Sequence, residues 1–266
     1  MPELPEVETI KRDLEKIILG KRIVKIIINN PKIIREPSPE LFKKGIEGTI
    51  IRKIFRRAKL LVLELSNNRF LTIHLKMTGQ LVYPGTGRTS RLSFVFKDAD
   101  MLDFNDQRLF ADLRLYSDWG RIKFIKTLGP EPFDLTFTDF KDMLSKRKTK
   151  IKGLLMEQSF VSGIGNIYAS EILFRAKIDP QRSAQSLKEA EKENLFKQMK
   201  SVLKSAILHG GSSVDDYVRV SGKNGDYMRF HQVYGRANKP CFICGKPIKK
   251  FQQGGRGTYH CVKCQI

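Results

Sequence analysis

Four cysteines near the carboxyl terminus are the clearest chemical signal in this sequence of 266 residues. They form two Cys-x2-Cys pairs separated by sixteen residues: Cys241 and Cys244, then Cys261 and Cys264. Two such pairs let two short turns supply four thiolates to one tetrahedral Zn²⁺. Two disulfides or an iron–sulfur centre are the alternatives, but the rest of the chain has no cysteine and no export signal is visible. The spacing predicts one structural zinc, with no coordination position left for catalysis.

The first six residues, MPELPE, hold two prolines and two glutamates. Pro5 suits the first turn of a helix, and the glutamates suit its positive end. Gly20 is a fitting stop for that helix. Its predicted apolar face is Val7, Ile10, Leu14, Ile17 and Ile18. Helix chemistry does not explain why Pro2 follows Met1 with Glu3 beside it.

The charge balance points to a polyanionic partner. The chain carries 49 Lys and Arg against 28 Asp and Glu, a net charge of +21 and an isoelectric point near 9.9. Nucleic acid is the first candidate and an anionic membrane surface the second. No apolar run is long enough to span a bilayer, and no amphipathic basic helix with an aromatic face supports surface binding. We expect a soluble, cytoplasmic, DNA-associated protein.

The texture of the chain changes near residues 127–134, where TLGPEPFD brings two prolines and a glycine. Residues 21–125 are rich in β-branched and aromatic residues between turn signals, which predicts a β-sandwich or barrel. Beyond the boundary the pattern is helical, and Ser186 with Glu189 predicts a capping box for a helix that ends at Gly210 and Gly211. Residues 212–236 read as a long loop. The fold class is therefore α+β.

Two stretches of the helical region are suited to phosphate. GIGNIY, residues 163–168, places bare N–H groups at a helix start, and Asn166 adds a side-chain amide. The alternative is a plain helix–turn–helix corner. The run KRKTKIK, residues 146–152, includes Arg147 and leads into the glycine turn. It is either a solvated basic face or a track for a phosphate backbone.

The remaining candidates are weak when each is considered alone. Lys59 begins an apolar strand, where a lysine is more often an edge residue than a catalyst. His74 fits a core or surface histidine equally well. Arg256, between glycines in the cysteine module, is either an exposed turn residue or a guanidinium able to grip a phosphate. Two bulky side chains and an arginine would suit a wedge in a base stack: Met77, Phe110 and Arg108.

Taken in order, these motifs resemble the formamidopyrimidine-DNA glycosylase family of bacterial base-excision enzymes. The matching segments are MPELPEVET, RRAK, GIGNIYASEILF, VYGR and the closing pair of Cys-x2-Cys motifs around GGRGT. The resemblance runs from end to end. The segment PELPEV also favours this branch over the endonuclease VIII branch, whose typical substrates are oxidised pyrimidines.

The resemblance implies a role for each catalytic candidate. Pro2, once Met1 is removed, would carry the secondary amine that attacks C1′ of the damaged nucleotide. Glu3 would be the acid and base at the sugar, and Lys59 the proton donor in β-elimination. Arg256 would contact phosphate and assist δ-elimination. Three side chains, Met77, Arg108 and Phe110, would fill the space left in the duplex, with Arg108 facing the orphaned cytosine.

The same resemblance implies DNA contacts by His74 and Asn166, and Arg147 belongs to the basic run expected along the backbone. Arg91 stands where many relatives have a DNA-contacting histidine. The segment DQRLFA replaces the commoner DPRRFG, so one arginine is Leu109, and the loop before VYGR also differs. These departures bear on substrate preference and DNA affinity.

The expected organisation is a catalytic β-sandwich over residues 1–130, a helical domain with a helix–two-turn–helix over 131–235, and a zinc-binding β-hairpin over 236–266. The expected activity is DNA glycosylase with abasic-site lyase, acting on oxidised purines in duplex DNA, as a monomer. The rival hypotheses are a DNA-binding zinc protein without catalysis and an endonuclease VIII-type enzyme. Pro2, Glu3 and Lys59 occurring together argue against the first.

Overall fold

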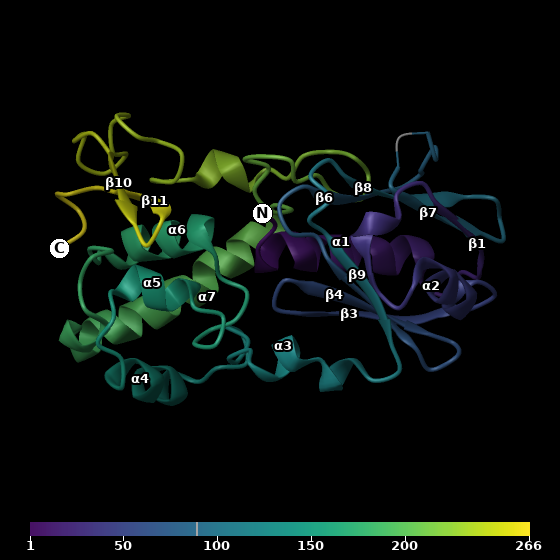
Figure 1. Ribbon diagram of the computed structural model, residues 1–266. Helices are drawn as coiled ribbons and strands as arrows, with labels where there is room; N and C mark the ends of the chain where they lie inside the picture. The colour runs from purple at the N-terminus through teal and green to yellow at the C-terminus, as the bar shows by residue number, and fades with distance from the viewer. Residues whose placement is uncertain (89) are drawn as a thin grey trace. The chain divides into compact units, whose positions relative to one another are not determined.

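A computed structural model describes residues 1–88 and 90–266, except for the side chain at position 121. The chain divides into two compact units (Figure 1). The first unit contains residues 1–126 and 207–228, and the second contains 127–206 and 229–266. This division assigns 207–228 to the first unit, whereas the sequence-based domains count that segment with the helical region.

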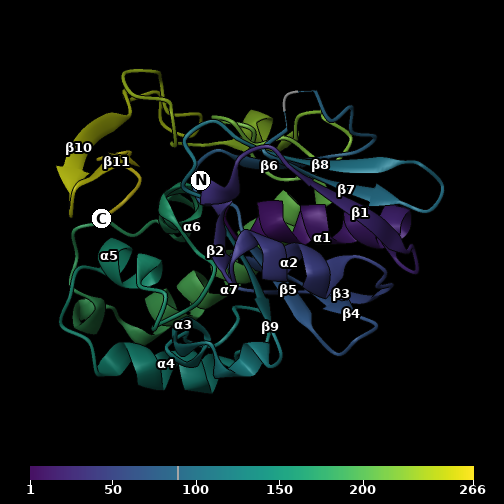
Figure 2. The ribbon, with the colours of Figure 1, turned by 45° about the vertical axis from the view of Figure 1, so that its right-hand side comes forward.

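Two β-sheets form the frame of the first unit (Figures 1 and 2). The four-stranded sheet is antiparallel and has the order β1 (Ile23–Ile28), β7 (Leu92–Phe96), β8 (Met101–Asp106), β6 (Gly79–Val82). The five-stranded sheet has the order β2 (Ile34–Glu36), β9 (Asp112–Tyr116), β5 (Phe70–His74), β4 (Leu60–Leu65), β3 (Ile51–Arg57). Only the β2–β9 pair in the second sheet is parallel. Strands β7 and β8 pair as a hairpin across residues 98–100.

Helix α1 (Leu4–Ile18) contributes its apolar face to the hydrophobic core of the first unit. Its residues Leu4, Val7, Ile10, Leu14 and Ile18 are each at most 1 % exposed. Ile17, predicted on the same face, is only partly buried. Gly20 follows with a φ of +80°, a conformation that suits glycine at a helix end. The predicted first helix is therefore confirmed. The smaller elements of this unit are α2 (Pro39–Ile46) and α3 (Lys123–Lys126), with 3-10 turns at Pro31–Ile33 and Trp119–Arg121.

Helices and one hairpin build the second unit. Its elements are α4 (Phe137–Ser145), α5 (Ile151–Met156), α6 (Asn166–Ala176), a 3-10 turn at Ala184–Ser186, most of α7 (Glu189–Leu208), β10 (Lys249–Gln253) and β11 (Arg256–His260). A further 3-10 turn, Tyr227–Phe230, interrupts the long segment that was predicted as a loop. The mixed α+β class is confirmed.

The capping box predicted for α7 is wrong. Ser186 lies in the preceding 3-10 turn, and the helix begins at Glu189. The carboxylate of Glu191 accepts a hydrogen bond from the backbone N–H of Lys188 at 2.7 Å, so the acid that caps this start lies two residues later. The far end agrees with the sequence, since Gly210 and Gly211 both have positive φ after the helix ends.

None of the helices in the described part of the chain is both long and apolar enough to cross a membrane. The longest of them, α7, carries seven Lys and Glu residues along its twenty positions.

Candidate active site and metal centre

The start of α1 is organised by a buried carboxylate. Glu3 is the N-cap residue of α1 and forms a capping box with Glu6. One oxygen of Glu6 accepts from the N–H of Glu3 at 2.7 Å, and the other accepts from the N–H of Ser212 at 2.8 Å. Glu3 is 3 % exposed and Glu6 1 %. Glu6 therefore holds the peptide group that follows Pro2. Glu6 is itself held by Ser212, which lies 206 positions further along the chain.

Lys59 is positioned by the same helix through an arginine. Lys59 follows Ala58 in the two-residue turn between β3 and β4 and is 7 % exposed. Arg56 donates to the carbonyl of Ala58 at 2.8 Å and to the carboxylate of Glu8 at 3.1 Å. Burial raises the pKa of Glu8, but hydrogen bonds from Arg12 and Arg56 outweigh it and hold that pKa below its ordinary value. Glu8 is thus an anion that fixes the turn bearing Lys59.

His74 ends β5 directly across from Leu60, so it lies beside Lys59 in the sheet. Its Nδ1 accepts from the N–H of Lys76 at 3.1 Å. Burial, and then the positive charges of Lys76 and Lys59, lower the pKa of His74 to about 3, although Asp112 acts in the opposite direction. His74 is consequently neutral near pH 7, with its proton on Nε2. A neutral imidazole can donate one hydrogen bond to a phosphate but brings no positive charge.

Asp106 joins the two segments predicted to fill the duplex. This residue is 1 % exposed, and its carboxylate accepts from the hydroxyl of Thr78 and from the N–H of Ala111 at 2.7 Å. It also accepts from the N–H of Arg108 at 3.2 Å. Thr78 directly follows Met77, so one buried acid holds both segments. Sequence reasoning missed Asp106 and Thr78, although an aspartate heading DQRLFA could have suggested a loop cap.

The loop held by Asp106 presents its side chains together. The guanidinium of Arg108 lies over the ring of Phe110, 4.6 Å from its centroid, and Phe110 is 50 % exposed. Leu109 between them has a φ of +56°, a left-handed conformation that is strained for a leucine. Arg91 donates from Nε to the carbonyl of Asp106 at 3.1 Å, so this arginine also belongs to the loop's support.

A buried lysine plays the corresponding part in the second unit. Lys152 is 1 % exposed, and its Nζ donates to Oδ1 of Asn166 and to Oγ1 of Thr258, each at 2.7 Å. The amide of Asn166 donates in turn to the carbonyl of Gly257 at 3.1 Å. The start of α6 and the strand β11 are therefore joined by one polar group. Sequence reasoning placed Lys152 in a solvated or phosphate-tracking run, and only the fold reveals its burial.

The segment VYGR is fixed by another buried acid. Glu171, on α6, is fully buried, and its carboxylate accepts from three consecutive N–H groups, those of Gln232, Val233 and Tyr234, at 2.8 to 3.0 Å. A carboxylate in such a nest of N–H groups needs no counter-ion to be satisfied. Glu171 is a positioning residue that the sequence did not single out.

The two remaining arginines lie on the surface of the second unit. Arg256 begins β11 opposite Gln253, directly after Gly254 and Gly255, and is exposed. Both glycines have positive φ, so the turn that presents Arg256 depends on them. Arg147 is partly exposed and lies 3.8 Å from a carboxylate oxygen of Glu157. No contact joins these two arginines to each other in the described residues.

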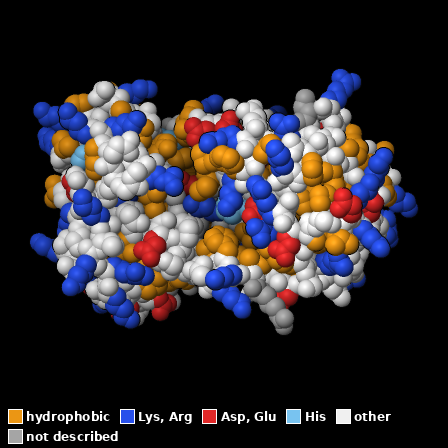
Figure 3. All heavy atoms as spheres, in the orientation of Figure 1, with side chains coloured by type: hydrophobic (Ala, Val, Ile, Leu, Met, Phe, Trp, Pro, Cys, Tyr) orange, Lys and Arg blue, Asp and Glu red, His pale blue; other side chains and the backbone are white. Residues whose placement is uncertain are grey.

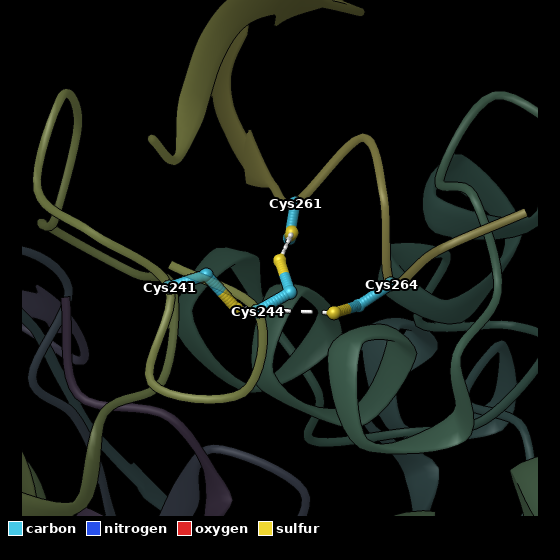
Figure 4. A group of neighbouring side chains, drawn as sticks. All are labelled: Cys241, Cys244, Cys261 and Cys264. Carbon is cyan, nitrogen blue, oxygen red and sulfur yellow. Dashed lines mark hydrogen bonds between the residues drawn. The ribbon is translucent and has the colours of Figure 1, made fainter. Parts of the chain in front are cut away.

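The four cysteines converge on one point (Figure 4). Their sulfur atoms all lie within 4.8 Å of one another, with Sγ–Sγ distances of 3.9 Å for Cys241–Cys264 and 3.4 Å for Cys244–Cys261. Zinc–thiolate bonds of about 2.3 Å in a tetrahedron place sulfurs about 3.8 Å apart. The set fits a single tetrahedral metal ion, and the predicted grouping of the cysteines is confirmed.

The surface carries the charge that the composition indicates. On the face drawn in Figure 3, Lys and Arg side chains are spread over both units and outnumber the acidic ones. From residue 227 to the end of the chain there are eight Lys and Arg and no Asp or Glu. The cysteine module is therefore a wholly basic element.

Comparison with known proteins identifies the family. Residues 1–113 match the family model of the formamidopyrimidine-DNA glycosylase N-terminal domain, and residues 128–218 match its H2TH domain. Formamidopyrimidine-DNA glycosylases of Listeria monocytogenes and Desulforamulus reducens are 38 % and 40 % identical to this chain, with 99 % or more of both chains covered in each case. The chain belongs to the formamidopyrimidine-DNA glycosylase family and is an enzyme of that family.

Comparison with solved structures gives the same family. The crystal structure of the MutM (Fpg) protein from Thermus thermophilus is similar with a TM-score of 0.89 at 36 % identity, covering 99 % of this chain and 98 % of that one. Lactococcus lactis Fpg has been solved with DNA that contains an abasic site and, as a mutant, with DNA that contains Fapy-dG. These complexes give TM-scores of 0.91 and 0.90 at 35 % and 36 % identity, each covering 99 % of both chains.

Proposed function

We propose that this protein is a bifunctional DNA glycosylase and abasic-site lyase that removes oxidised purines, 8-oxoguanine and formamidopyrimidines, from duplex DNA. Family membership supports the glycosylase class, and the Lactococcus lactis complexes support abasic-site and Fapy-dG DNA as ligands. The single observation that carries the mechanism is that Glu6 accepts hydrogen bonds from the N–H groups of both Glu3 and Ser212, which fixes the peptide next to Pro2 at the positive, buried start of α1.

The chemistry begins at the amine of Pro2, which requires removal of Met1. The lone pair of that nitrogen forms a bond to C1′ while the bond to the base breaks, and the base leaves with the electron pair and a proton. The amine loses its own proton, and opening of the sugar gives a cationic iminium. We assign proton transfer at the sugar to Glu3, whose carboxylate is in the same buried helix start.

Strand cleavage follows from the iminium. Its positive charge acidifies the C2′ proton, and we assign the carboxylate of Glu3 to accept that proton. The electron pair of the C–H bond forms the C2′–C3′ double bond, and the C3′–O bond breaks as the 3′ phosphate leaves in β-elimination. We assign proton donation in this step to Lys59, held by the chain from Glu8 through Arg56. A second elimination releases the 5′ phosphate, and we assign its phosphate contact to Arg256 on the basic hairpin.

DNA binding is assigned to groups in both units. His74 and Asn166 would donate to phosphates, and Arg91 and Arg147 would add positive charge along the backbone. Met77, Arg108 and Phe110 would fill the space of the extruded nucleotide, and the Arg108–Phe110 stack suits that role. Because many contacts are to phosphate, binding should weaken steeply with salt, which filter binding at several salt concentrations would measure.

The metal proposed for the cysteine site is one zinc ion, because four thiolates in this geometry are its usual structural donor set. Bound zinc would hold the two Cys-x2-Cys turns together and leave no open position. Elemental analysis of purified protein should find one zinc per chain. Iron, or no metal with two disulfides, would contradict the assignment.

For organisation, we propose the catalytic domain at 1–130, the helical domain at 131–235 and the zinc hairpin at 236–266. We also propose a monomer that acts on DNA in the bacterial cytoplasm. Light scattering of the protein with and without duplex tests the first point, since a dimer would contradict it. Fractionation of cells tests the second.

Borohydride trapping tests the nucleophile. Processed protein would be incubated with a duplex carrying one 8-oxoguanine opposite cytosine, reduced, and digested for mass spectrometry. We expect the cross-link on Pro2. Pro2→Gly should lower base removal and strand cleavage at least about tenfold with duplex binding largely intact. Pro5→Gly is the control, because it makes the same replacement away from the amine.

Full activity of Pro2→Gly would remove the nucleophile assignment. Trapping with a pyrimidine lesion but not with 8-oxoguanine would indicate an enzyme of endonuclease VIII type. Tight binding without any adduct, even on an abasic site, would indicate a binding protein without catalysis.

A further inference from the structure

The segment 212–226 forms a closed loop in the first unit. At its base, the N–H of Asp226 donates to the carbonyl of His209 at 2.8 Å, and the N–H of Gly225 donates to Oγ of Ser213 at 2.9 Å. A Cβ at Gly225 would lie 2.2 Å from the carbonyl oxygen of Gly210, so the two ends of the loop touch closely. The base of the loop is thus fixed by backbone contacts.

The far part of the loop is attached elsewhere. Val220 is fully buried, and its carbonyl accepts from the N–H of Tyr83 at 2.7 Å. Gln80, on β6, donates to the carbonyl of Asp216. These contacts connect the loop to the four-stranded sheet.

A bidentate ion pair connects the same part of the loop to α1. Arg219 donates to the carboxylate of Asp13 from Nη2 at 2.7 Å and from Nε at 3.1 Å. The Asp13 side chain is 12 % exposed, and both planar groups are engaged along two parallel bonds. Glu6 and Asp13 are seven positions apart on α1, which places them on one face of the helix. Helix α1 therefore holds the loop at Ser212 and again at Arg219.

The position of the loop matters because one of its residues, Asp216, lines a polar cavity. This cavity has a volume of about 340 Å³ and is lined by Asp216 of the loop and by Thr78, Gln80, Arg91, Asn105 and Asp106 of the sheet region, with Gln107. Oδ1 of Asn105 is buried there without a hydrogen-bond partner among the described atoms. A base drawn out of a duplex must enter a pocket that reads its polar edge. An abasic nucleotide has no base to place there.

We propose that Asp13 and Arg219 are positioning residues that lock the 212–226 loop onto α1, and so set the rate of base excision without setting the rate of cleavage at a preformed abasic site. The proposal rests on the proposed function for its activity readout. It adds a role for two charged residues to which the proposed chemistry assigns no step.

The test uses the full-length protein and three variants: Asp13→Asn, Arg219→Gln and the exchanged pair Asp13→Arg with Arg219→Asp. Glu15→Gln is the matched control, because it removes an acid of α1 that pairs with Lys11 at 3.1 Å on the helix surface. Single-turnover rates are measured on an 8-oxoguanine duplex and on a duplex with a preformed abasic site. Amide hydrogen exchange is followed at the 219–223 turn, where the N–H of Arg219 bonds the carbonyl of Lys223.

We expect Asp13→Asn and Arg219→Gln to slow excision about tenfold and abasic-site cleavage less than about twofold. Exchange at the turn should accelerate in both variants, and the exchanged pair should recover most of the excision rate. Unchanged excision, or an equal fall in both reactions, would overturn the proposal, as would unchanged exchange at the turn. If the unmodified protein cleaves neither duplex, the proposed function fails, and the exchange result alone still decides whether the pair locks the loop.

Discussion

In each unit a buried ion joins distant segments at the candidate site, and these two ions, Glu6 and Lys152, have opposite charge. In the first unit the carboxylate of Glu6 accepts from the N–H groups of Glu3 and Ser212. In the second unit the ammonium of Lys152 donates to oxygens of Asn166, Thr258 and, at 3.3 Å, Gly257. Each ion therefore joins segments that are distant in the chain through these hydrogen bonds to neutral groups.

The difference follows from what each segment has to offer. A helix start and an irregular loop present N–H groups in excess, so an acid suits the first unit. A hairpin edge, a hydroxyl and an amide oxygen present acceptors, so a base suits the second. In both cases the charge is 1 % exposed, and its hydrogen bonds must replace those of water. The comparison predicts that removing either ion costs more than removing a surface charge.

The largest effect is expected at Lys152. Lys152→Met keeps an unbranched side chain but leaves Oδ1 of Asn166 and Oγ1 of Thr258 without their donor. We expect the free energy of unfolding to fall by about 2 to 4 kcal/mol, with faster amide exchange along β11. Chemical denaturation measures the first effect and exchange mass spectrometry the second.

Lys148→Met is the control for this change, since it removes an exposed lysine four positions earlier. Equal stability of the two variants, within about 0.5 kcal/mol, would mean that the buried ammonium adds nothing beyond its desolvation cost. The comparison between the units would then fail on the cationic side.

A smaller effect is expected at Glu6. Glu6→Gln keeps the shape of the side chain, but one of the two carboxylate oxygens is replaced by an NH2 group. That group then faces an N–H donor, either that of Glu3 or that of Ser212. We expect a loss of about 1 to 3 kcal/mol and a slower reaction at Pro2, because the adjacent peptide is held less firmly. Denaturation and single-turnover excision are the measurements, with Glu15→Gln as the helix control. A loss of stability with an unchanged excision rate would separate this carboxylate from the chemistry.

The sequence predicts the local parts of both sites and few of their long-range connections. The helix start at residues 2–6 and the paired Cys-x2-Cys motifs depend on neighbours within a few positions, so spacing was enough. Ser212 and Thr258 could not be assigned, because their partners lie 206 and 106 positions away. The wrong capping box at Ser186 has the same origin: a 3-10 turn took residues that the local pattern assigned to α7.

The smallest effect is expected at His74, as a dependence of stability on pH. It contrasts the two buried ions with a buried side chain that is neutral near pH 7. The folded protein lowers the pKa of His74 to about 3 through burial and through Lys76 and Lys59, while Asp112 opposes the shift. The unfolded chain binds a proton near pH 6.5, so between that value and pH 3 it holds more protons than the folded chain, and stability falls as the pH falls.

His74→Asn retains an acceptor for the N–H of Lys76 but does not titrate. We expect the stability of the native protein, relative to this variant, to fall by about 1 to 2 kcal/mol between pH 7 and pH 5. Denaturation curves at several pH values measure this, and an NMR titration of the ring reports the protonation directly. Parallel pH profiles for the two proteins would mean that the pKa of His74 is the same in the folded and the unfolded chain, and would make it a cationic partner for a phosphate below about pH 6.5.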